Sequence, residues 1–499
     1  MINKMIYRYL LAGAALITLP AMAADLKVEA GGLEGMLDES IMSETVLRLS
    51  GTMDVRDFVT IADRMKSLRE LDLTDVKIEF YRPAADKKVS IGEAEFAADA
   101  LPAGALLGKK LTSLRLPAGL KTIGQGALAG NSFAVIEIPQ TVTSIGVGAF
   151  YDNAALRSIV IPASVNELGE YALARCTALG EADLSSMSVT SIPDRLFSED
   201  TALETVKFPA GIKTIGQGSF AGCTALESVS LPASVAVIGK HAFTGAGLKT
   251  VDLPKSVTEI GDYAFALCPA LSAATLANGN AVLGKGLFFY CPAFVSFTAS
   301  GISAYPDYLF AGDAALAMPE GFENLESIGA YALKDNSAEQ LRLGGSLVFL
   351  GDGAMEGMTA LNSVDAQALG DRIPELGSEV FAGIDQKTVV MTVAENTGDA
   401  WRAADQWCEF KISPVVGLDE TLSSADTGVK AWFTPGILNV IAPAEIQSVE
   451  IYDTAGRAVM SLRPASESVQ ADVSALADRI YVVRVNLRSG LTATFKLTR

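Results

Sequence analysis

The residue types that most often carry catalysis are scarce in this 499-residue chain, which has one histidine and five cysteines. His241 is the only histidine, so any mechanism in which an imidazole activates serine or cysteine would depend on it alone. A histidine metal site is excluded by number, and no Cys-x-x-Cys or Cys/His spacing suits zinc. Carboxylates are plentiful, but no pair stands out as the acid and base of a glycosidase. The sequence therefore predicts no catalytic residue, no metal and no cofactor, and we interpret the chain as a non-enzyme.

The cysteines are predicted to be buried thiols. Their odd number argues against a complete disulfide framework. Four of them occupy one position of a repeated pattern: Cys176, Cys223, Cys268 and Cys291. The same position elsewhere holds Asn153, Asp200, Asp313 or Met358, which is typical of a turn residue that faces the core. Cys268 and Cys291 belong to adjacent repeats, about 4.8 Å apart if stacked as in a sheet. Their parallel Cβ directions do not favour a disulfide, and whether they are bridged is left open.

The elements that position these residues come from a repeat of 22 to 24 residues between Leu111 and Leu361. Its pattern is L-x-x-L-x-L-P-x-x-V-x-x-I-G-x-x-A-F-x-x-C/N, as in Leu226–Phe243. A fixed period of this length predicts a solenoid, in which each unit buries its apolar side against its neighbours. The L-x-L part is a short strand that proline ends, Ile-Gly is a second extended piece before a tight turn, and Ala-Phe enters a short helical turn. The phenylalanines are expected in the core: Phe150, Phe197, Phe220, Phe243, Phe265, Phe288, Phe310 and Phe381.

The domain order follows from where this pattern starts and stops. Residues 24–66 do not repeat and are expected to cap the open end of the solenoid, with Asp54 capping a helix. Residues 67–413 are expected to form the repeat solenoid, interrupted by a polar loop over residues 82–88 and closed by a helical cap that carries Trp401 and Trp407. Residues 414–429 are polar and small, which is typical of a linker. Residues 430–499 contain short strands separated by turns, among them residues 438–441 and 447–452, and predict a small β-sandwich.

Two rows of outward-facing positions are the candidate binding residues. The first takes the residue between the two strand leucines, and its charged members are Arg115, Glu137, Asp183, Lys207, Asp252, Arg342 and Asp365. The second row, one turn later, holds Tyr171, His241, Tyr263, Tyr308 and Tyr331. Aromatic side chains anchor protein partners or stack on sugars, and half-buried packing against neighbouring repeats is the alternative interpretation of this row. The mixed charges of the first row argue against recognition of a polyanion.

Charge and targeting signals indicate export. The net charge of −19 disfavours nucleic acid and anionic lipid as partners. Residues 1–23 resemble a signal peptide: Lys4 and Arg8 form the positive end, Leu10–Leu19 is an apolar core too short to span a bilayer, and cleavage is expected between Ala23 and Ala24. No later stretch has 18 consecutive apolar residues, so no transmembrane segment is predicted.

Over roughly residues 68–391, the repeat resembles the BspA-like leucine-rich repeat family, whose units carry the same L-P…I-G-x-x-A-F-x-x-C pattern. Residues 397–407 are similar to the end cap of that family, while the pattern departs from it over residues 316–343. The resemblance implies a surface adhesin, or a module that binds host matrix proteins, other cells or glycans.

The C-terminal domain resembles the type A sorting domain of the type IX secretion route in certain Gram-negative bacteria. The matching motifs are residues 449–457, 472–476 and 480–485, although Ala477-Asp478-Arg479 stands where that family has Pro-Ala-Gly. The resemblance implies that the chain reaches the outer cell surface, or is secreted, by way of the periplasm, and that residues 430–499 contact the secretion machinery. Cleavage of the domain is left open.

Together these features predict an exported, surface-displayed protein that binds a protein partner. The alternatives are a glycan-binding surface module and a structural surface scaffold without a soluble ligand.

Overall fold

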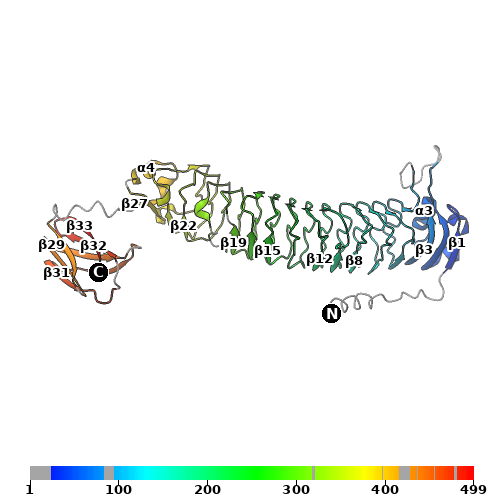
Figure 1. The fold of residues 1–499 in the computed structure, drawn as a ribbon, viewed down its shortest axis with the longest axis horizontal. Helices are drawn as coiled ribbons and strands as arrows, with labels where there is room; N and C mark the ends of the chain where they lie inside the picture. Colours follow the sequence, from blue (N-terminus) through cyan, green and yellow to red (C-terminus); the bar gives the residue numbers. More distant parts are fainter. Residues whose placement is uncertain are drawn as a thin grey trace. The chain divides into compact units, whose positions relative to one another are not determined.

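The structure is a computed structural model of the chain, drawn in Figure 1. It describes residues 24–83, 95–299, 301–316, 318, 321–395, 397–414, 428–434, 436–453, 456–476 and 480–498. The predicted signal peptide and its cleavage site therefore lie outside the described residues, as do most of the predicted loop over residues 82–88 and most of the linker. The chain divides into two compact units, a repeat unit that reaches Ile412 and a C-terminal unit.

The N-terminal cap begins with an edge strand and ends on the first strand of the solenoid. Strands β1 (Ala24–Val28), β2 (Val46–Met53) and β3 (Glu70–Ile78) pair side by side in parallel. Between them lie η1 (Leu33–Met36), α2 (Glu39–Ser43) and α3 (Val55–Arg64). Asp54 caps α3 through a capping box with Asp57, as the sequence predicts for its N-terminus. This sheet covers the core of the first repeat.

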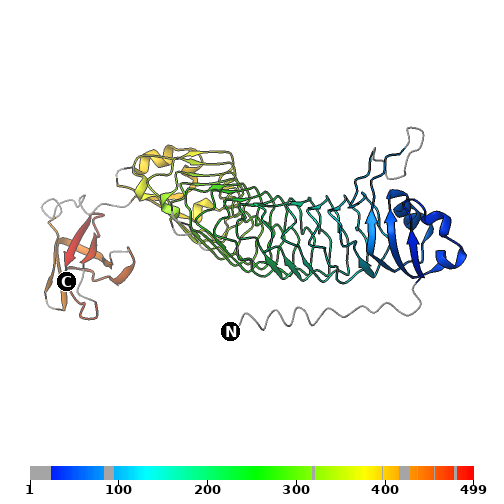
Figure 2. The same cartoon turned by 45° about the vertical axis from the view of Figure 1, so that its right-hand side comes forward.

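Each repeat forms one rung of the solenoid, and equivalent strands of successive rungs pair in parallel. The leucine strands follow β3 along one side: β5 (Ser113–Arg115), β8 (Ser158–Val160), β10 (Glu181–Asp183), β12 (Thr205–Lys207), β15 (Thr250–Leu253), β17 (Ala273–Leu276), β19 (Ser296–Ala299), β22 (Gln340–Arg342), β24 (Ser363–Asp365), β26 (Val390–Val393) and β27 (Lys411–Pro414). Figure 2 shows the successive rungs of this unit from a second direction. The predicted leucine-rich repeat solenoid is confirmed.

The Ile-Gly pieces form a second series of two-residue strands, each followed by a glycine or proline. They are β4 (Ala100–Leu101), β6 (Thr122–Ile123), β7 (Ser144–Ile145), β9 (Glu167–Leu168), β11 (Ser191–Ile192), β13 (Thr214–Ile215), β14 (Val237–Ile238), β16 (Glu259–Ile260), β18 (Val282–Leu283), β20 (Ala304–Tyr305), β21 (Ser327–Ile328), β23 (Phe349–Leu350) and β25 (Glu375–Leu376). The glycine after the strand is required by packing, since a Cβ on Gly239 would meet the backbone of Gly216 and Gln217 in the preceding rung.

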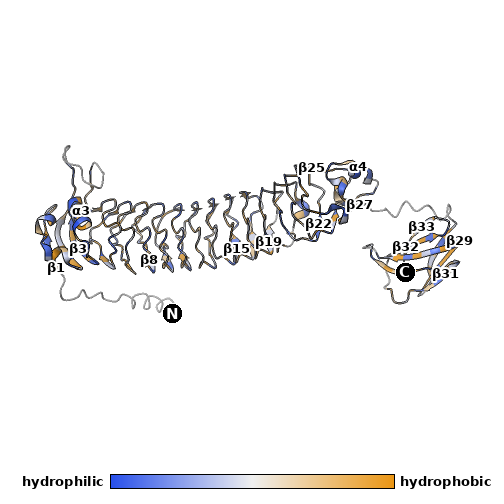
Figure 3. Cartoon of the chain, turned by 180° about the vertical axis from the view of Figure 1, so that it is seen from behind, coloured by the Kyte–Doolittle hydropathy of each residue, from blue (hydrophilic) through white to orange (hydrophobic). Residues whose placement is uncertain are grey.

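The core is a column of apolar side chains inside the rungs. All eight phenylalanines predicted to be core residues are buried. Their rings stack from rung to rung: the centroids of Phe220 and Phe243 are 5.1 Å apart and those of Phe243 and Phe265 are 5.3 Å apart, with nearly parallel planes. In Figure 3, hydrophobic and hydrophilic residues alternate along the rung strands, as expected for strands with one buried face.

The segment that contains Ala-Phe differs from its prediction, because it is not helical. In the rung that contains Phe150, N–H groups donate alternately to the carbonyl three residues back and to the next rung: Ala149 N to Gly146 O, and Phe150 N to Ala172 O. Two residues per rung, four positions apart, take a left-handed conformation, here Gly148 (φ 59°) and Asp152 (φ 57°). A right-handed helix cannot continue through such residues, so the segment is a chain of hydrogen-bonded turns that adds a third ladder between rungs.

The far end of the repeat unit is closed by α4 (Gly398–Ala403) and η5 (Trp407–Glu409). Trp401 and Trp407 are fully buried with ring centroids 5.2 Å apart, and Trp407 also contacts Phe381. Three more single-turn segments lie in the last rungs: η2 (Phe322–Asn324), η3 (Gln367–Leu369) and η4 (Gln386–Thr388). The two indoles act as the predicted end cap.

The C-terminal unit is an antiparallel sheet whose arrangement is compatible with the predicted β-sandwich. Its strands are β28 (Lys430–Thr434), β29 (Ile437–Tyr452), β30 (Ala458–Leu462), β31 (Ser466–Asp472), β32 (Ile480–Leu487) and β33 (Thr492–Thr498). The separate strands predicted at 438–441 and 447–452 are one long strand, β29, with a register shift between Ile441 and Ile446. Its first half pairs with β28 and β31, and its second half pairs with β30 and β32. The irregularity lets this one strand pair with both sets of neighbours around a common core.

Candidate interaction surfaces

The charged positions predicted on the leucine strands do face outward. Arg115, Glu137, Lys207, Asp252 and Arg342 are exposed, and Asp183 is partly exposed. Strand register then places unlike charges opposite each other, because Asp183 pairs with Lys207 and Arg342 pairs with Asp365.

These opposed charges bind one another. The Lys207 ammonium lies 3.6 Å from Asp183 and also contacts Glu181, and the hydrogen bond to Glu181 raises the pKa of Lys207. The Arg342 guanidinium lies 3.2 Å from Asp365. Exposed pairs of this kind contribute little to stability, but they leave much of this row electrostatically satisfied. A partner would gain less from it than its residue types suggest.

The second predicted row is more unusual, because its aromatic side chains stand on left-handed backbone. We call Tyr171, His241, Tyr263, Tyr308 and Tyr331 the turn row. Their φ angles lie between 55° and 59°. Equivalent positions in other rungs hold Gly126, Gly148, Gly218, Gly286 and Gly353, also with positive φ. A left-handed conformation costs a residue with a Cβ about 1–2 kcal/mol, whereas glycine adopts it freely. Glycine would therefore be the stable choice at all of these positions.

The turn row packs into a ladder of rings between His241 and Tyr331. The imidazole of His241 stacks on Tyr263 with centroids 5.4 Å apart and planes 8° apart, and Tyr308 stacks on Tyr331 at 5.1 Å and 18°. Phe289 bridges the two pairs edge to face, at 5.8 Å from Tyr263 and 6.2 Å from Tyr308. His241 is exposed, and the other four rings are partly exposed.

Phe289 and Tyr290 are members of this surface that sequence reasoning missed. Gly286 occupies the turn-row position of their rung, so the row of aromatic residues is interrupted there in the sequence. The bridging ring comes instead from Phe289, three residues later, and Tyr290 contacts Phe289 at 4.6 Å with 49% of its side chain exposed. The signal was present as the triple Phe288-Phe289-Tyr290, in which only Phe288 is needed for the core.

At both ends of the turn row, the chain's own cations cover the rings. The guanidinium of Arg195 lies 5.4 Å from the centre of the Tyr171 ring, and the ammonium of Lys334 lies 5.5 Å from that of Tyr331. Among the described residues, no cation lies over Tyr263, Tyr290 or Tyr308 in this way. The middle of the ladder is thus its open part.

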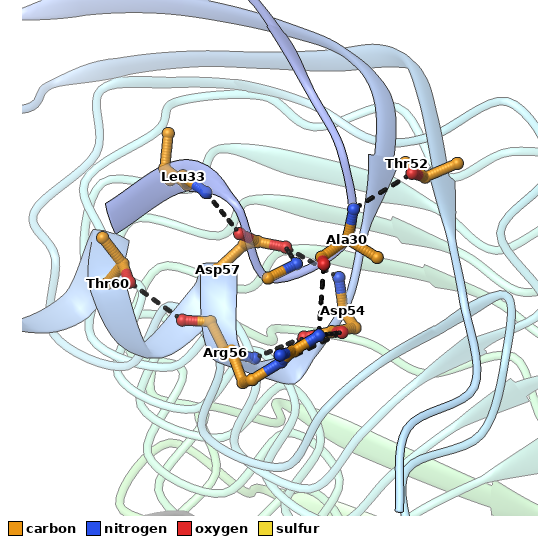
Figure 4. Close-up of polar contacts among 8 residues, drawn as sticks. Ala30, Leu33, Thr52, Asp54, Arg56, Asp57 and Thr60 are labelled. Carbon is orange, nitrogen blue, oxygen red and sulfur yellow. Dashed lines mark hydrogen bonds and ion pairs between the residues drawn. The ribbon is translucent and has the colours of Figure 1, made fainter. Parts of the chain in front are cut away.

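A cluster of charged side chains in the N-terminal cap has a structural role (Figure 4). The buried carboxylate of Asp57 accepts hydrogen bonds from the backbone N–H groups of Gly31, Leu33 and Asp54. Asp54 binds the guanidinium of Arg56, which also donates to the carbonyl of Ala30. These hydrogen-bonding partners belong to the cap itself, and the Arg56 guanidinium also lies 4.5 Å from the centre of the Tyr81 ring, so the cluster ties the entry segment to α3 and has a structural role.

The repeat loses regularity near residue 300, and a hollow of about 640 Å³ opens there, lined by Phe297, Ile302, Tyr305 and Leu325. Its polar lining residues, Glu323 and Asn324, are exposed.

In the described residues we find no group of His, Cys, Asp or Glu side chains arranged to hold a metal ion. None of the helices in the described ranges has the length and apolar character needed to cross a membrane.

The five cysteines are free thiols, with Cys408 exposed and the other four buried. Cys268 and Cys291 do not form a disulfide. Their thiols donate hydrogen bonds to the carbonyls of Phe243 and Phe265, respectively, each in the preceding rung. This geometry satisfies each sulfur without a bridge between them.

The parallel strands, short period and buried leucine and phenylalanine columns define a leucine-rich repeat protein. The sequence matches the family described as BspA type leucine rich repeat region, in six copies, over residues 100–224, 190–317 and 306–397. These ranges span more than half of the chain, which therefore belongs to this family.

Solved structures were found that are similar to parts of this chain. A leucine-rich repeat protein from Bacteroides ovatus is 19% identical, with 80% of this chain and 93% of that chain covered and a TM-score of 0.57. A leucine rich cell surface protein from Faecalibacterium prausnitzii is 23% identical, covering 49% and 82% with a TM-score of 0.31. The pneumococcal vaccine antigen PcpA is 15% identical, covering 59% and 83% with a TM-score of 0.31. The likeness to the first shows a common fold. No curated protein matches the sequence.

Proposed function

We propose that this chain is an exported surface repeat protein that binds a protein partner through its turn row. The observation that carries the proposal is the strained conformation of the row. Most of the other rungs place glycine at these positions without strain, the exceptions being Arg195 and Glu379, whereas these rungs keep a large aromatic side chain at a cost of about 1–2 kcal/mol each. Strain of this kind tends to occur where a side chain is needed for function.

The chemistry of the open part of the ladder suits a protein partner. Tyrosine is among the residue types that contribute most to protein interfaces, because it combines a large apolar ring with a polar edge. Around Tyr263, the charged side chains pair with each other, since Lys240 lies 2.8 Å from Asp262. A sugar that stacks on aromatic rings needs open ring faces, but the faces of His241, Tyr263, Tyr308 and Tyr331 are turned toward neighbouring rings. The ladder therefore favours the protein alternative over the glycan alternative.

Export and display are supported by sequence resemblance together with the separate folding unit at the C-terminus. Residues 430–499 form a β-sheet with its own core. We propose that the leader directs the chain to the periplasm and that this unit then contacts the secretion machinery, which delivers the repeat to the cell surface or releases it. Deletion of residues 430–499 should leave the protein in the periplasm, as judged by protease accessibility on whole cells. Undiminished surface display of the deleted protein would remove the sorting role.

Binding is tested with the chain from residue 24 to 499, immobilised and exposed to a panel of purified extracellular-matrix proteins and bacterial surface proteins. We expect saturable binding to at least one of them. The variant Tyr263→Gly/Tyr308→Gly should weaken it at least tenfold, since interface tyrosines often contribute 2 kcal/mol or more.

The matched control is Tyr171→Gly, which removes a turn-row tyrosine that Arg195 already covers and should leave affinity within twofold. Equal losses in the two variants, or binding only on a glycan array, would contradict the proposed surface. Self-assembly of the purified protein without any binding would favour the scaffold alternative.

A further inference from the structure

One buried position recurs from the rung of Leu106 to that of Met355, three residues after the core phenylalanine or its equivalent. We call its occupants the spine: Lys109, Asn131, Asn153, Cys176, Asp200, Cys223, Ala246, Cys268, Cys291, Asp313, Asn336 and Met358. All of them are buried. The spine is therefore a line of mostly polar groups inside an apolar core, and each group needs a hydrogen-bonding partner.

The asparagines show how a spine residue is satisfied. The Oδ1 of Asn153 accepts from the backbone N–H of Asn131 in the preceding rung at 2.7 Å. Its Nδ2 donates to the carbonyl of Leu128 in that rung at 3.1 Å. The cysteines reproduce only the second contact, because a thiol donates to the equivalent carbonyl: Cys176 to Phe150 at 3.3 Å and Cys223 to Phe197 at 3.1 Å. A donor aimed at the preceding rung is thus the common requirement of the position.

The two aspartates satisfy only half of this pattern as carboxylates. Asp200 Oδ1 accepts from the N–H of Cys176 at 2.7 Å, and Asp313 Oδ1 accepts from the N–H of Cys291 at 2.6 Å. In both residues the Oδ2 is buried and has no hydrogen-bond partner. That oxygen occupies the place of the asparagine Nδ2, where the spine requires a donor.

The backbone carbonyls that would accept a hydrogen bond from this donor also accept none from a backbone N–H group. By the register of the spine, they are Leu173 O for Asp200 and Phe288 O for Asp313. In several other rungs the spine N–H donates to such a carbonyl of its own rung, as Cys223 N does to Phe220 O and Ala246 N does to Phe243 O. Here the N–H groups of Cys176 and Cys291 are diverted to the aspartate Oδ1 atoms, and no backbone N–H of the described residues donates to Leu173 O or Phe288 O. At each site, two acceptors thus lack a donor: the Oδ2 of the aspartate and the carbonyl oxygen of the preceding rung.

We propose that Asp200 and Asp313 are uncharged carboxylic acids at neutral pH, that each donates from its protonated Oδ2 to the preceding rung, and that alkaline pH opens the rungs they join. One proton per site supplies the missing donor. An ionised carboxylate would instead bring a buried charge against a carbonyl oxygen, with no cation to balance it.

The electrostatics of the spine agree with this arrangement. Burial raises the pKa of Asp200 well above its ordinary value and raises that of Asp313 to about 9, and one backbone hydrogen bond in each case lowers it only in part. The titratable groups that face Asp200 from its two neighbouring rungs are the thiols of Cys176 and Cys223, and burial raises the pKa of both. Asp313 lies between Cys291 and the uncharged Asn336. No cation is among the causes that shift either aspartate.

The direction of the pH effect follows from linkage. Both acids have a folded-state pKa above the unfolded value, so their contribution to stability is complete at acidic pH. It is lost as pH rises above the unfolded pKa, near 4, until the folded pKa is passed. In that window, each aspartate increases the equilibrium constant for opening about tenfold per pH unit.

The buried thiols next to the aspartates report this opening. In the full chain, pulses of iodoacetamide between pH 6 and 9, followed by mass spectrometry, give the alkylation rate of Cys176, Cys223 and Cys291. Division by the rate of the exposed Cys408 corrects for the reactivity of the reagent. We expect the corrected rates of the wild-type protein to rise by up to tenfold per pH unit. In Asp200→Asn/Asp313→Asn they should be lower and nearly flat with pH, because asparagine supplies the same acceptor and a permanent donor, as at Asn153.

Two further variants complete the test. Asp252→Asn removes an exposed carboxylate and should label as the wild type does. Asp200→Ala/Asp313→Ala mimics Ala246 in the same position, and it should also lose the pH dependence even if it is less stable overall. An Asn variant that labels faster than the wild type, or a pH slope that persists in both the Asn and the Ala variants, would overturn the proposal.

Discussion

At the residue scale, the turn row shows how one repeat position can hold either glycine or a large aromatic. Both fit because the side chain points outward, and only the left-handed backbone distinguishes them energetically. The sequence displays this exchange between Gly126, Tyr171, Gly218 and Tyr263, and it identified the row as outward-facing. The strain could not be derived in the same way, because a tyrosine alone does not reveal a positive φ.

Neighbouring members of the row are adapted to each other, which gives a prediction. A Cβ on Gly286 would collide with the ring of Tyr263, whereas a Cβ on Gly126 meets no atom within 4 Å, although both glycines have φ near 60°. Gly126→Ala should therefore lower the free energy of unfolding by about 1 kcal/mol, from backbone strain alone. Gly286→Ala should lower it by a further 1–3 kcal/mol through overpacking, as measured by chemical denaturation.

The double variant Tyr263→Gly/Gly286→Ala provides the control for this comparison. Without the Tyr263 ring, Gly286→Ala should lower the free energy of unfolding by no more than Gly126→Ala does. Identical losses for the two single variants would show that the ring moves aside freely and that the ladder is loosely packed.

At the element scale, the repeat determines far more of this structure than the segments that break it. The L-x-L alternation, proline and Ile-Gly of each rung predicted both series of strands, because each residue type has one physical role that recurs along the chain. The turns after Ala-Phe were predicted as helical, since the dipeptide alone does not show that left-handed residues stand on either side of it. In the C-terminal unit, residues 438–441 and 447–452 were interpreted as two strands, although they belong to the single strand β29, because a proline such as Pro443 is unusual inside a strand.

The first rung and α3 are joined by a spine residue, which leads to a second prediction. Lys109 is buried, and its ammonium donates to the carbonyls of Ile61 and Met65 at the C-terminal end of α3, at 2.8 and 2.6 Å. Burial lowers the pKa of Lys109 only to about 8, so the group remains mostly charged at neutral pH. Lys109→Met should destabilise the cap by about 1–3 kcal/mol, because two buried carbonyls lose their charged donor.

Hydrogen exchange is the measurement for this variant, with faster exchange expected in α3 and β2 and no change in the rungs beyond Phe150. Lys110→Met is the matched control, since its side chain is exposed. Exchange in α3 that is equal in the two variants would show that Lys109 does not anchor the cap.

At the scale of the whole repeat unit, stability is a sum of contacts between neighbouring rungs, so a local change should act locally. The predicted end cap gives the sharpest test. Trp407 is 1% exposed and packs against Trp401, Phe381 and Phe410. Trp407→Ala should cost about 3–5 kcal/mol, as truncation of a buried aromatic side chain usually does. Because contacts pass only from rung to rung, this loss should appear as faster hydrogen exchange in β25, β26 and β27 and should fade toward β22.

Trp432→Ala in the C-terminal unit is the control, because it removes an indole that is 39% exposed and should leave hydrogen exchange in the rungs unchanged. Loss of protection along the entire column of rungs in Trp407→Ala would mean that the unit unfolds as one block, and the nearest-neighbour description of this solenoid would then be wrong.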